Sequence, residues 1–442
     1  MHERPSTVSI IGLGKLGAPL AACIATKAFR VIGVDVDSSK VEAINKGLAP
    51  VFEPGLQEML AVVKERLTAT QDIEVAVLAS DVTFIVVPTP SDPHGGFSLN
   101  YVLPTCEAIG RVLRAKEDFH LTVLSSTVMP GSTGGPVRST LERVSGKRCG
   151  PDFGLCYSPE FIALGSVIPD FLNPDFILIG ESEPRSGEML EALYGKVCNN
   201  DPRVARMNFI NAELTKLAVN TFVTTKITFA NTLARICERL PEADVDVVTS
   251  ALGLDSRIGR KYLKGAIGYG GPCFPRDNVA FAALARQIGA PAALAETTDQ
   301  TNREEVHRLA TLIKSKMSQG DTVGILGLAY KPNTDVIEEA QGVLLAQVLA
   351  SEAIPVVAYD PAAMDNARRM LHEPVRFAES PEACVQEADV LVVTTPWEDF
   401  GRLEPALLER HGTPRVLIDC WRILNQRRFR TVVDYVALGV GS

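Results

Sequence analysis

Several features that define other protein classes are missing from this sequence. Its 442 residues carry a formal net charge of −9, so no basic excess is present to neutralise the phosphates of a nucleic acid. It has no run of 18 apolar residues and no apolar signal segment after Met1, which predicts a cytoplasmic protein with no membrane partner. The nine cysteines include no CxxC pair and no Cys/His cluster, so we expect reduced thiols and no bound metal.

What is present first is an alternation of short β-branched runs with helical stretches. Val8–Ile11 and Arg30–Val34 predict strands on either side of a helix at Ala18–Lys27. Further strand-like runs follow at Val82–Val87, Leu121–Leu124 and Phe176–Ile179. Strands that alternate with helices predict a parallel, doubly wound sheet. We therefore expect a first α/β domain over residues 1–205.

A long helical stretch then separates this domain from a second α/β pattern. Asn208–Arg239 contains no glycine or proline, and Pro241 ends it. Strand-like runs resume at Thr322–Leu326, Pro355–Ala358, Val390–Val393 and Val416–Ile418. The sequence thus predicts an α/β chain of two doubly wound domains, 1–205 and 310–442, joined by a helical region at 206–309. A long helix in such a place is a candidate contact for a homodimer.

A glycine-rich turn lies between the first strand and its helix. Gly12, Gly14 and Gly17 follow the GxGxxG order, which lets the backbone approach a pyrophosphate at a helix N-terminus. Asp35 ends the next strand, where a carboxylate accepts from both ribose hydroxyls and repels a 2′-phosphate. A tight turn in any α/β protein is the alternative. The register of turn, helix and carboxylate favours a dinucleotide site, with NAD preferred over NADP.

A second glycine-rich segment, Gly268–Asp277, surrounds Cys273. Its glycines leave the backbone able to approach a ligand, and such flexible residues are costly unless the geometry demands them. Arg276 and Asp277 supply charge beside the thiol. A single cysteine is more often a small buried apolar residue, so the segment by itself gives a candidate nucleophile only.

Two further segments carry candidate catalytic side chains. Lys216 and Asn220 are four residues apart on the long helix, so they share one face and could hold an oxyanion. A solvated helix face is the alternative. Glu160 has apolar and proline neighbours that could raise its pKa and make it a base toward water, although helix capping or salt bridging is the commoner role.

Together these segments resemble the UDP-glucose/GDP-mannose dehydrogenase family, most closely its UDP-glucose 6-dehydrogenase branch. The similarity extends from Val8 to about Trp397 and rests on the shared order and spacing of several motifs. They are Val87-Pro88-Thr89-Pro90, Ser125-Ser126-Thr127-Val128, Ser158-Pro159-Glu160-Phe161, Lys216 with Asn220, Asp255-Ser256-Arg257-Ile258-Gly259, Gly270-Gly271-x-Cys273 and Lys331-Pro332-Asn333-Thr334-Asp335. The resemblance implies two Rossmann-like domains joined by a long central helix, NAD as cofactor, and a homodimer or higher homo-oligomer.

The resemblance also implies a four-electron, NAD-dependent oxidation of the C6 hydroxyl of a nucleoside-diphosphate hexose, UDP-glucose being the first choice. Cys273 would add to the C6 aldehyde and carry it as a thioester until water releases the uronate. The other implied roles are charge stabilisation at the C6 oxygen (Lys216, Asn220), ordering of the proton relay and water (Asp277, Thr127) and hydrolysis (Glu160).

Binding residues are implied for both ligands. The cofactor would contact Gly12, Gly14, Lys15, Leu16, Gly17, Asp35, Lys40, Pro88, Thr89, Thr127 and Arg276. The nucleotide sugar would contact Glu160, Phe161, Lys216, Asn220, Arg257, Tyr269, Gly270, Gly271 and Lys331. Of these, Arg257 would reach into the sugar site of a neighbouring subunit, and Lys331 would lie on the nucleotide side.

Four segments depart from the family pattern. Arg276 stands where a lysine is usual, which keeps the charge but not the shape. The segment Phe161–Gly165 lacks a charged pair, and Val336–Ala340 lacks an arginine that is expected near Glu338. Asp419–Arg422 replaces a common Asp-Gly-Arg-Asn. These differences fall at positions that bind substrate and cofactor in the family. Two alternatives to UDP-glucose oxidation therefore stay open: the same reaction on another nucleotide sugar (UDP-N-acetylhexosamine or a dTDP-hexose), and a non-catalytic nucleotide-binding protein.

Overall fold

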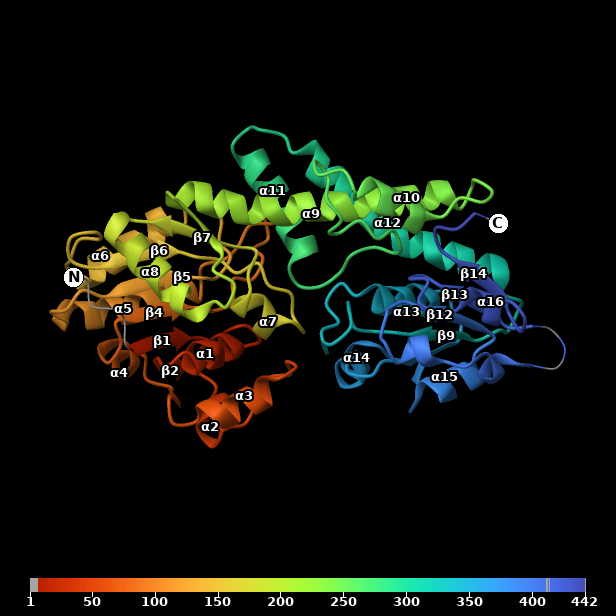
Figure 1. Cartoon of the computed structure of the whole chain (residues 1–442), viewed down its shortest axis with the longest axis horizontal. Helices are drawn as coiled ribbons and strands as arrows, with labels where there is room; N and C mark the ends of the chain where they lie inside the picture. Colours follow the sequence, from red (N-terminus) through yellow and green to blue (C-terminus); the bar gives the residue numbers. More distant parts are fainter. Residues whose placement is uncertain (1–6, 411, 413, 442) are drawn as a thin grey trace. The chain divides into compact units, whose positions relative to one another are not determined.

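The structure, a computed structural model, describes residues 7–410, 412 and 414–441 (Figure 1). The chain divides into two compact units, Met1–Ala218 and Val219–Ser442. Each unit is described by itself below. Within the described ranges, no helix is long and apolar enough to cross a membrane. The prediction that no signal segment follows Met1 concerns residues 1–6, which lie outside those ranges.

The first unit contains an eight-stranded sheet in the order β3-β2-β1-β4-β5-β6-β7-β8. Its strands are β1 (Thr7–Ile11), β2 (Arg30–Val34), β3 (Leu67–Thr70), β4 (Val82–Ile85), β5 (Leu121–Leu124), β6 (Gly154–Tyr157), β7 (Phe176–Glu181) and β8 (Arg203–Met207). Neighbouring strands are parallel except for β6 and β7, which pair antiparallel. The parallel sheet that the sequence predicts is therefore present, with a reversal at its far edge.

Helices cover both faces of this sheet. They are α1 (Gly17–Thr26), α2 (Ser38–Lys46), α3 (Leu56–Val63), α4 (Ile73–Leu78), α5 (Val102–Ala115), α6 (Arg138–Ser145), α7 (Val167–Leu172) and α8 (Pro184–Val197), with a π-helical turn at Thr133–Val137. One apolar cluster packs α1, α3, α7 and α8 on the sheet, and a second packs α4, α5, α6 and the start of α9. Because successive strand side chains point to opposite faces, Phe84 belongs to the first cluster and Ile85 to the second.

The long helix α9 (Phe209–Cys237) begins in the first unit and continues into the second, and it confirms the long helix predicted at 208–239. The second unit then adds α10 (Val245–Leu252), α11 (Phe274–Gln287), α12 (Ala293–Lys316), α13 (Gln341–Ser351), α14 (Met364–Met370), α15 (Pro381–Glu387), α16 (Gln426–Phe429) and two 3₁₀ turns (Phe400–Arg402, Pro405–Leu408). A three-part division at residues 205 and 310 stays a prediction.

A six-stranded parallel sheet forms the core of the second unit, in the order β11-β10-β9-β12-β13-β14. Its strands are β9 (Val323–Leu326), β10 (Val356–Tyr359), β11 (Val375–Phe377), β12 (Val390–Val393), β13 (Val416–Asp419) and β14 (Asp434–Ala437). One large apolar cluster surrounds it. In both sheets the chain order reverses beside the first strand, and ligands of open α/β sheets bind outside the carboxyl ends of strands at that point.

The two sheets repeat one local device at this reversal. Gly12 (φ +102°) follows β1 and Gly327 (φ +114°) follows β9. A Cβ on Gly17 would lie 1.8 Å from the Gly12 carbonyl oxygen, and a Cβ on Gly342 would lie 1.9 Å from that of Gly327. Glycine is therefore required at both ends of each turn. The two halves are structural repeats, each placing a glycine turn at the carboxyl end of its first strand.

Candidate active site

The turn between β1 and α1 has the geometry that a dinucleotide pyrophosphate requires. A Cβ on Gly14 would meet no atom within 4 Å, so the backbone here faces open space. The N-cap of α1 is Leu16, and no side chain caps this end of the helix. The N–H of Ala18 donates to the Gly14 carbonyl (3.1 Å) and Pro19 has none, so an anion here would face the backbone of Gly14 to Gly17, where the helix dipole favours its charge. Lys15 lies in the same turn.

Asp35 is held in one orientation at the end of β2. Its Oδ2 accepts from the backbone N–H of Leu13 (2.8 Å) and from the Lys40 ammonium (3.3 Å), and its Oδ1 accepts from the N–H of Asp37 (2.9 Å). A carboxylate offers about four acceptor positions. With three occupied, capacity for a ribose hydroxyl remains, so the residues fit NAD.

The corresponding carboxylate of the second unit is used differently. Asp360 is 1% exposed and accepts five hydrogen bonds. The donors are the N–H groups of Leu328, Ala329, Ala362 and Ala363 and the indole of Trp397. Asp360 has no acceptor position left for a ribose. Of the two repeated turns, the first therefore has the chemistry of a dinucleotide site.

The loops after β4 and β5 end at the same edge of the first sheet. The Thr89 hydroxyl donates to the Thr127 carbonyl (2.7 Å), so the two predicted cofactor residues are joined directly, next to Pro88. Glu213 of α9 is fully buried and accepts from the N–H groups of Gly131 (2.6 Å) and Thr133 (2.7 Å). This carboxylate fixes the loop that follows Thr127.

Glu160 lies after β6 in a mainly apolar setting. Its Oε1 accepts from the Tyr194 hydroxyl (3.3 Å), and the Lys216 ammonium donates to its backbone carbonyl (2.6 Å) while lying 4.6 Å from the centre of the Phe161 ring. Burial raises the pKa of Glu160 to about 7, although the Tyr194 bond and the Lys216 charge act in the opposite direction. The predicted rise of this pKa is confirmed. Glu160 can change protonation near neutral pH.

The loop that follows Glu160 is anchored from behind by another carboxylate. Glu53 accepts from the N–H groups of Gly165 (2.8 Å) and Val167 (2.7 Å) and is itself buried. The segment Phe161–Gly165 lacks the charged pair, but Glu53 still holds the loop in place.

Lys216 and Asn220 are buried rather than solvated. Their exposed fractions are 6% and 7%, which rules out the alternative of a solvated helix face. The two side chains have separate partners, since Lys216 donates to Glu160 while the Asn220 amide donates to Oδ2 of Asp277 (2.6 Å). Shared binding of an oxyanion stays a prediction.

Cys273 differs from every other cysteine of the chain, all nine of which lie in the described ranges. It is exposed, whereas the other eight are buried or half-buried. Burial raises the pKa of Cys23, Cys106 and Cys384 to about 12 each, so their thiolates are scarce at neutral pH. Cys273 is the N-cap residue of α11, and a helix N-terminus favours a thiolate.

Two charged residues follow in the first turn of α11. Asp277 is 1% exposed, and the Arg276 guanidinium lies 3.6 Å from its Oδ1. Because Asn220 binds Oδ2 of Asp277, the carboxylate is held from both sides behind the thiol-bearing turn. The predicted catalytic residues Asn220, Cys273 and Asp277, and the predicted cofactor contact Arg276, thus lie on α9 and at the start of α11 in one unit.

Glycine is required before Cys273 because of contacts within the protein, and not because of a ligand as the sequence suggests. A Cβ on Gly270 would lie 2.2 Å from the Glu339 carbonyl oxygen, and one on Gly271 (φ +88°) would lie 2.7 Å from the Tyr330 ring. Gly270 therefore makes room for the segment near residue 339, and Gly271 makes room for the Tyr330 ring. The N–H of Tyr269 binds Asn302, so a role of this backbone toward a sugar stays a prediction.

Arg257 and Lys331 lie on loops of the second unit. The Arg257 side chain is 86% exposed and makes a two-point ion pair with Asp255, at 3.0 Å (Nε to Oδ1) and 2.6 Å (Nη2 to Oδ2). Lys331 is half-buried on the loop after β9, at the carboxyl edge of the sheet. Their predicted contacts with a substrate stay predictions.

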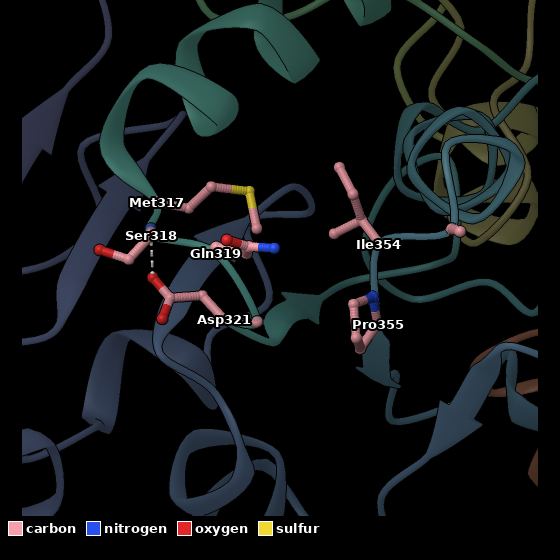
Figure 2. Close-up of a pocket in the computed structure, with 8 residues that line it drawn as sticks. Met317, Ser318, Gln319, Asp321, Ile354 and Pro355 are labelled. Carbon is pink, nitrogen blue, oxygen red and sulfur yellow. Dashed lines mark hydrogen bonds between the residues drawn. The ribbon is translucent and has the colours of Figure 1, made fainter.

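A hollow of about 460 Å³ in the second unit lies away from these residues (Figure 2). Its lining comes from the loops before β9 and β10, including Met317, Asp321 and Ile354. Those loops precede the strands, at the edge opposite to the glycine turn. Because ligands of such sheets bind at the carboxyl ends, this hollow is separate from the candidate site.

Tyr194 and Glu213 are site residues that sequence reasoning missed. Tyr194 contacts Glu160 from 34 residues away, so no local pattern joins them. Glu213 precedes Lys216 by three residues and Asn220 by seven, so it belongs to the same helix face. Its spacing was a usable signal.

The fold and the site together define a dinucleotide-dependent oxidoreductase. Comparison with known proteins gives the family. The chain matches the NAD binding domain (residues 6–198), the central domain (210–304) and the UDP binding domain (324–426) of the UDP-glucose/GDP-mannose dehydrogenase family. The chain belongs to this family, so it is an NAD-dependent dehydrogenase of nucleotide sugars. The predicted family, fold class, enzyme class and cofactor are confirmed.

Individual relatives match over most of their length. The chain is 36% identical over 438 residues to the UDP-glucose 6-dehydrogenase AglM of Haloferax volcanii, covering 98% of this chain and 99% of that protein. It is 34% identical over 357 residues to the GDP-mannose 6-dehydrogenase of Pseudomonas aeruginosa, covering 80% of each. A solved UDP-glucose dehydrogenase from Pyrobaculum islandicum is 34% identical, with a TM-score of 0.90 and 99% of both chains covered.

Proposed function

We propose that the enzyme oxidises C6 of UDP-glucose to the carboxylate of UDP-glucuronate through a covalent intermediate on Cys273. The observation that carries the proposal is the placement of Cys273, the exposed cysteine, at the N-terminus of α11. The choice of sugar is supported by the UDP-glucose enzymes of Haloferax volcanii and Pyrobaculum islandicum, which match nearly the whole chain.

The first oxidation removes the proton of the C6 hydroxyl and a hydride from C6, leaving an aldehyde. The Gly12–Gly17 turn and Asp35 would hold NAD, which would be the hydride acceptor in this oxidation and in the second one. We assign to Lys216 and Asn220 the stabilisation of negative charge on the C6 oxygen, because both donor side chains are buried and fixed. Asp277, bound to Asn220, receives the hydroxyl proton and passes it to water.

Cys273 then captures the aldehyde. Its thiolate forms a C–S bond to C6 while the carbonyl oxygen gains a proton, which gives a thiohemiacetal. This tetrahedral carbon keeps one hydrogen, and its loss as hydride, together with the hydroxyl proton, leaves a thioester. The N-terminus of α11 stabilises the attacking thiolate. No free aldehyde is released, because the carbon stays bonded to the protein.

Water completes the reaction by attacking the thioester carbon. Glu160 takes a proton from that water, and the C–S bond breaks to return the Cys273 thiolate and a uronic acid, which loses its proton to solvent as the uronate. A base with a pKa near the working pH is the most effective one, and burial places the pKa of Glu160 at about 7. Thr127, on the loop fixed by Glu213, orders the water.

The test is NADH formation by the purified full chain on a panel of nucleotide sugars. We expect two NADH per UDP-glucose, loss of turnover in Cys273→Ser, and parent activity in Cys198→Ser, a half-buried control thiol. The altered segment Val336–Ala340 makes the same reaction on UDP-N-acetylhexosamine or a dTDP-hexose the second candidate. Turnover of one of these without turnover of UDP-glucose would refute our choice of sugar.

We also propose a homodimer formed through α9. Phe222, Phe229 and Ile236 are 66%, 51% and 49% exposed, and their seven-residue spacing puts them on one face of the helix. Leu240 after α9 and Val247 of α10 are also exposed, at 52% and 67%. Exposed large apolar side chains repeated along one helix face are typical of an interface, and a second copy of α9 matches their helical spacing.

Light scattering on the purified chain tests the dimer. Phe222→Glu combined with Phe229→Glu should give a monomer, whereas Val62→Glu, at a 73% exposed position of α3, should leave the mass unchanged. If Arg257 completes the sugar site of its neighbour, mixed Arg257→Ala and Cys273→Ala chains should recover part of the activity. A parent chain that is monomeric at all concentrations would contradict the proposal.

The location we propose is the cytoplasm. All nine cysteines are thiols, which suits a reducing compartment. Fractionation of cells that express the full chain should place it with cytoplasmic markers, and recovery from a secreted fraction would contradict this.

A further inference from the structure

The backbone just before Cys273 is held by side chains instead of by a neighbouring strand. Residues 265–271, which we call the approach segment, belong to no helix or strand. Five residues nevertheless contact its polar backbone groups. They are Asn231 of α9, Asn302 of α12, Gln341 of α13 (Nε2 to the Tyr269 carbonyl, 3.4 Å), Arg422 after β13 and Glu338 through its carbonyl.

Two of these contacts are made by buried amides that each bind the segment at two points. Asn231 is 2% exposed; its Oδ1 accepts from the N–H of Ala266 (2.8 Å) and its Nδ2 donates to the carbonyl of Ile267 (2.9 Å). Asn302 is 6% exposed and binds the N–H and the carbonyl of Tyr269 at 2.7 and 2.9 Å. Each amide therefore imitates the backbone of a paired strand.

The ends of the approach segment are held as well. The Arg422 guanidinium donates to the Gly265 carbonyl (2.6 Å) and makes a two-point ion pair with Asp246 of α10, at 2.8 Å for each contact. The N–H of Gly271 donates to the Glu338 carbonyl (2.9 Å). The hydrogen bonds therefore run from the first residue of the segment to the last.

Gly268 shows how closely the amide lies against this backbone. A Cβ at this position would lie 2.8 Å from Oδ1 of Asn302 and 2.9 Å from Oε1 of Gln341. Glycine makes room for the amide but also gives the chain extra conformational freedom. The two-point contacts hold Ile267 and Tyr269 on either side of Gly268 and so restrict that freedom.

We infer that Asn231 and Asn302 are positioning residues for Cys273, because they fix the approach segment and thereby the place of the thiol. The inference rests on the proposed function only in taking Cys273 as the nucleophile. A reacting atom displaced by about 1 Å can lose ~100-fold in rate. A glycine-rich segment without such contacts would let the thiol sample many positions.

The first test replaces Asn302 with leucine, which has a similar shape but no hydrogen-bonding group. We expect kcat to fall ~10- to 100-fold, because the thiol is no longer held at its reacting position. The alkylation rate of Cys273 by iodoacetamide, measured on its own peptide, should change at least ~3-fold. Asn45→Leu is the matched control, since Asn45 binds the N–H and the carbonyl of Ala69 at 2.8 and 3.0 Å. Its kcat and Cys273 alkylation should equal those of the parent.

The second test, Asn302→Asp, separates positioning from a general loss of stability. A protonated carboxyl both donates and accepts, as the amide does, whereas an ionised one only accepts. Activity and Cys273 alkylation should therefore match the parent at low pH and diverge as the new carboxyl ionises. The charged residues Asp299 and Arg303 act on Tyr269 in both the parent and the variant. The pH dependence of the parent therefore serves as the baseline for the variant.

The outcomes distinguish this inference from the proposed function. If Asn302→Leu and Asn302→Asp keep parent kcat and parent alkylation at every pH while Cys273→Ser is inactive, the inference is wrong and the proposed nucleophile stands. If both Asn302 variants alter alkylation as expected while Cys273→Ser turns over normally, the positioning role stands and the nucleophile is wrong. A reduced kcat with unchanged alkylation and no recovery of Asn302→Asp at low pH also overturns the inference.

Discussion

Replacing Glu160 with glutamine should make the protein more stable and less active at the same time. The raised pKa of Glu160 means that the folded chain holds this proton more tightly than the unfolded chain does. The group's favourable contribution is complete below pH ~4.5 and is lost as the pH rises through about 7. Above that pH the fold bears the cost of a buried carboxylate, which a neutral amide of the same shape removes.

The magnitude follows from the two pKa values. Each pH unit of separation between folded and unfolded pKa is ~1.4 kcal/mol. A rise from 4.5 to about 7 therefore corresponds to roughly 3 kcal/mol at alkaline pH. Tyr194 and the Lys216 charge partly stabilise the carboxylate and are already included in this pKa.

Urea unfolding at pH 5 and pH 8 measures the effect. Glu160→Gln should be roughly 2–3 kcal/mol more stable than the parent at pH 8 and less than ~1 kcal/mol more stable at pH 5. For Glu65→Gln, at an exposed position, the difference in unfolding free energy from the parent should be the same at both pH values. The same Glu160→Gln protein should form NADH in a burst and then stall, since water attack on the thioester has lost its base. Equal stabilisation at the two pH values would refute the reasoning.

Three further predictions concern the stability of the first unit and its cofactor turn. Lys116→Met should lower the free energy of unfolding by ~2–4 kcal/mol in a urea titration, because the ammonium binds carbonyls at the end of α4, including that of Val77 (2.9 Å); a loss under 1 kcal/mol would contradict this. Gly17→Ala should prevent stable folding, which the thermal unfolding midpoint measures. Gly14→Ala should fold normally and bind NAD ~10-fold more weakly in titration calorimetry. Equal effects of the two substitutions would count against a pyrophosphate-binding turn. Asp35→Asn should raise NADP use relative to NAD ~10-fold in kcat/KM, and an unchanged ratio would contradict the ribose assignment.

The sequence predicted the central strands better than the edge ones. β2, β5 and β12 begin and end at the predicted residues, because each is a short, mainly apolar run with β-branched residues. β3 and β11 were not predicted, since Leu67–Thr70 and Val375–Phe377 are short edge strands with polar positions. Burial at the edge of a sheet is incomplete, so the apolar signal there is weak.

Within the site, the sequence located single residues but not their partners. Cys273 stands out locally by its glycines, and Lys216 and Asn220 by their helical spacing. Asn302 contacts Tyr269 across 33 residues, and Asn231 contacts Ile267 across 36. An asparagine in a helix gives no sign that it is buried, so such contacts appear only once the helices are packed.

The central claim is that Cys273 carries the substrate carbon, and mass analysis of a stalled reaction tests it most directly. Glu160→Gln mixed with UDP-glucose and NAD, then quenched, should yield a Cys273 peptide bearing the uronyl group in thioester linkage. The adduct should be sensitive to hydroxylamine and absent without NAD. NADH formation with an unmodified Cys273 peptide, or with the adduct on another residue, would contradict the account.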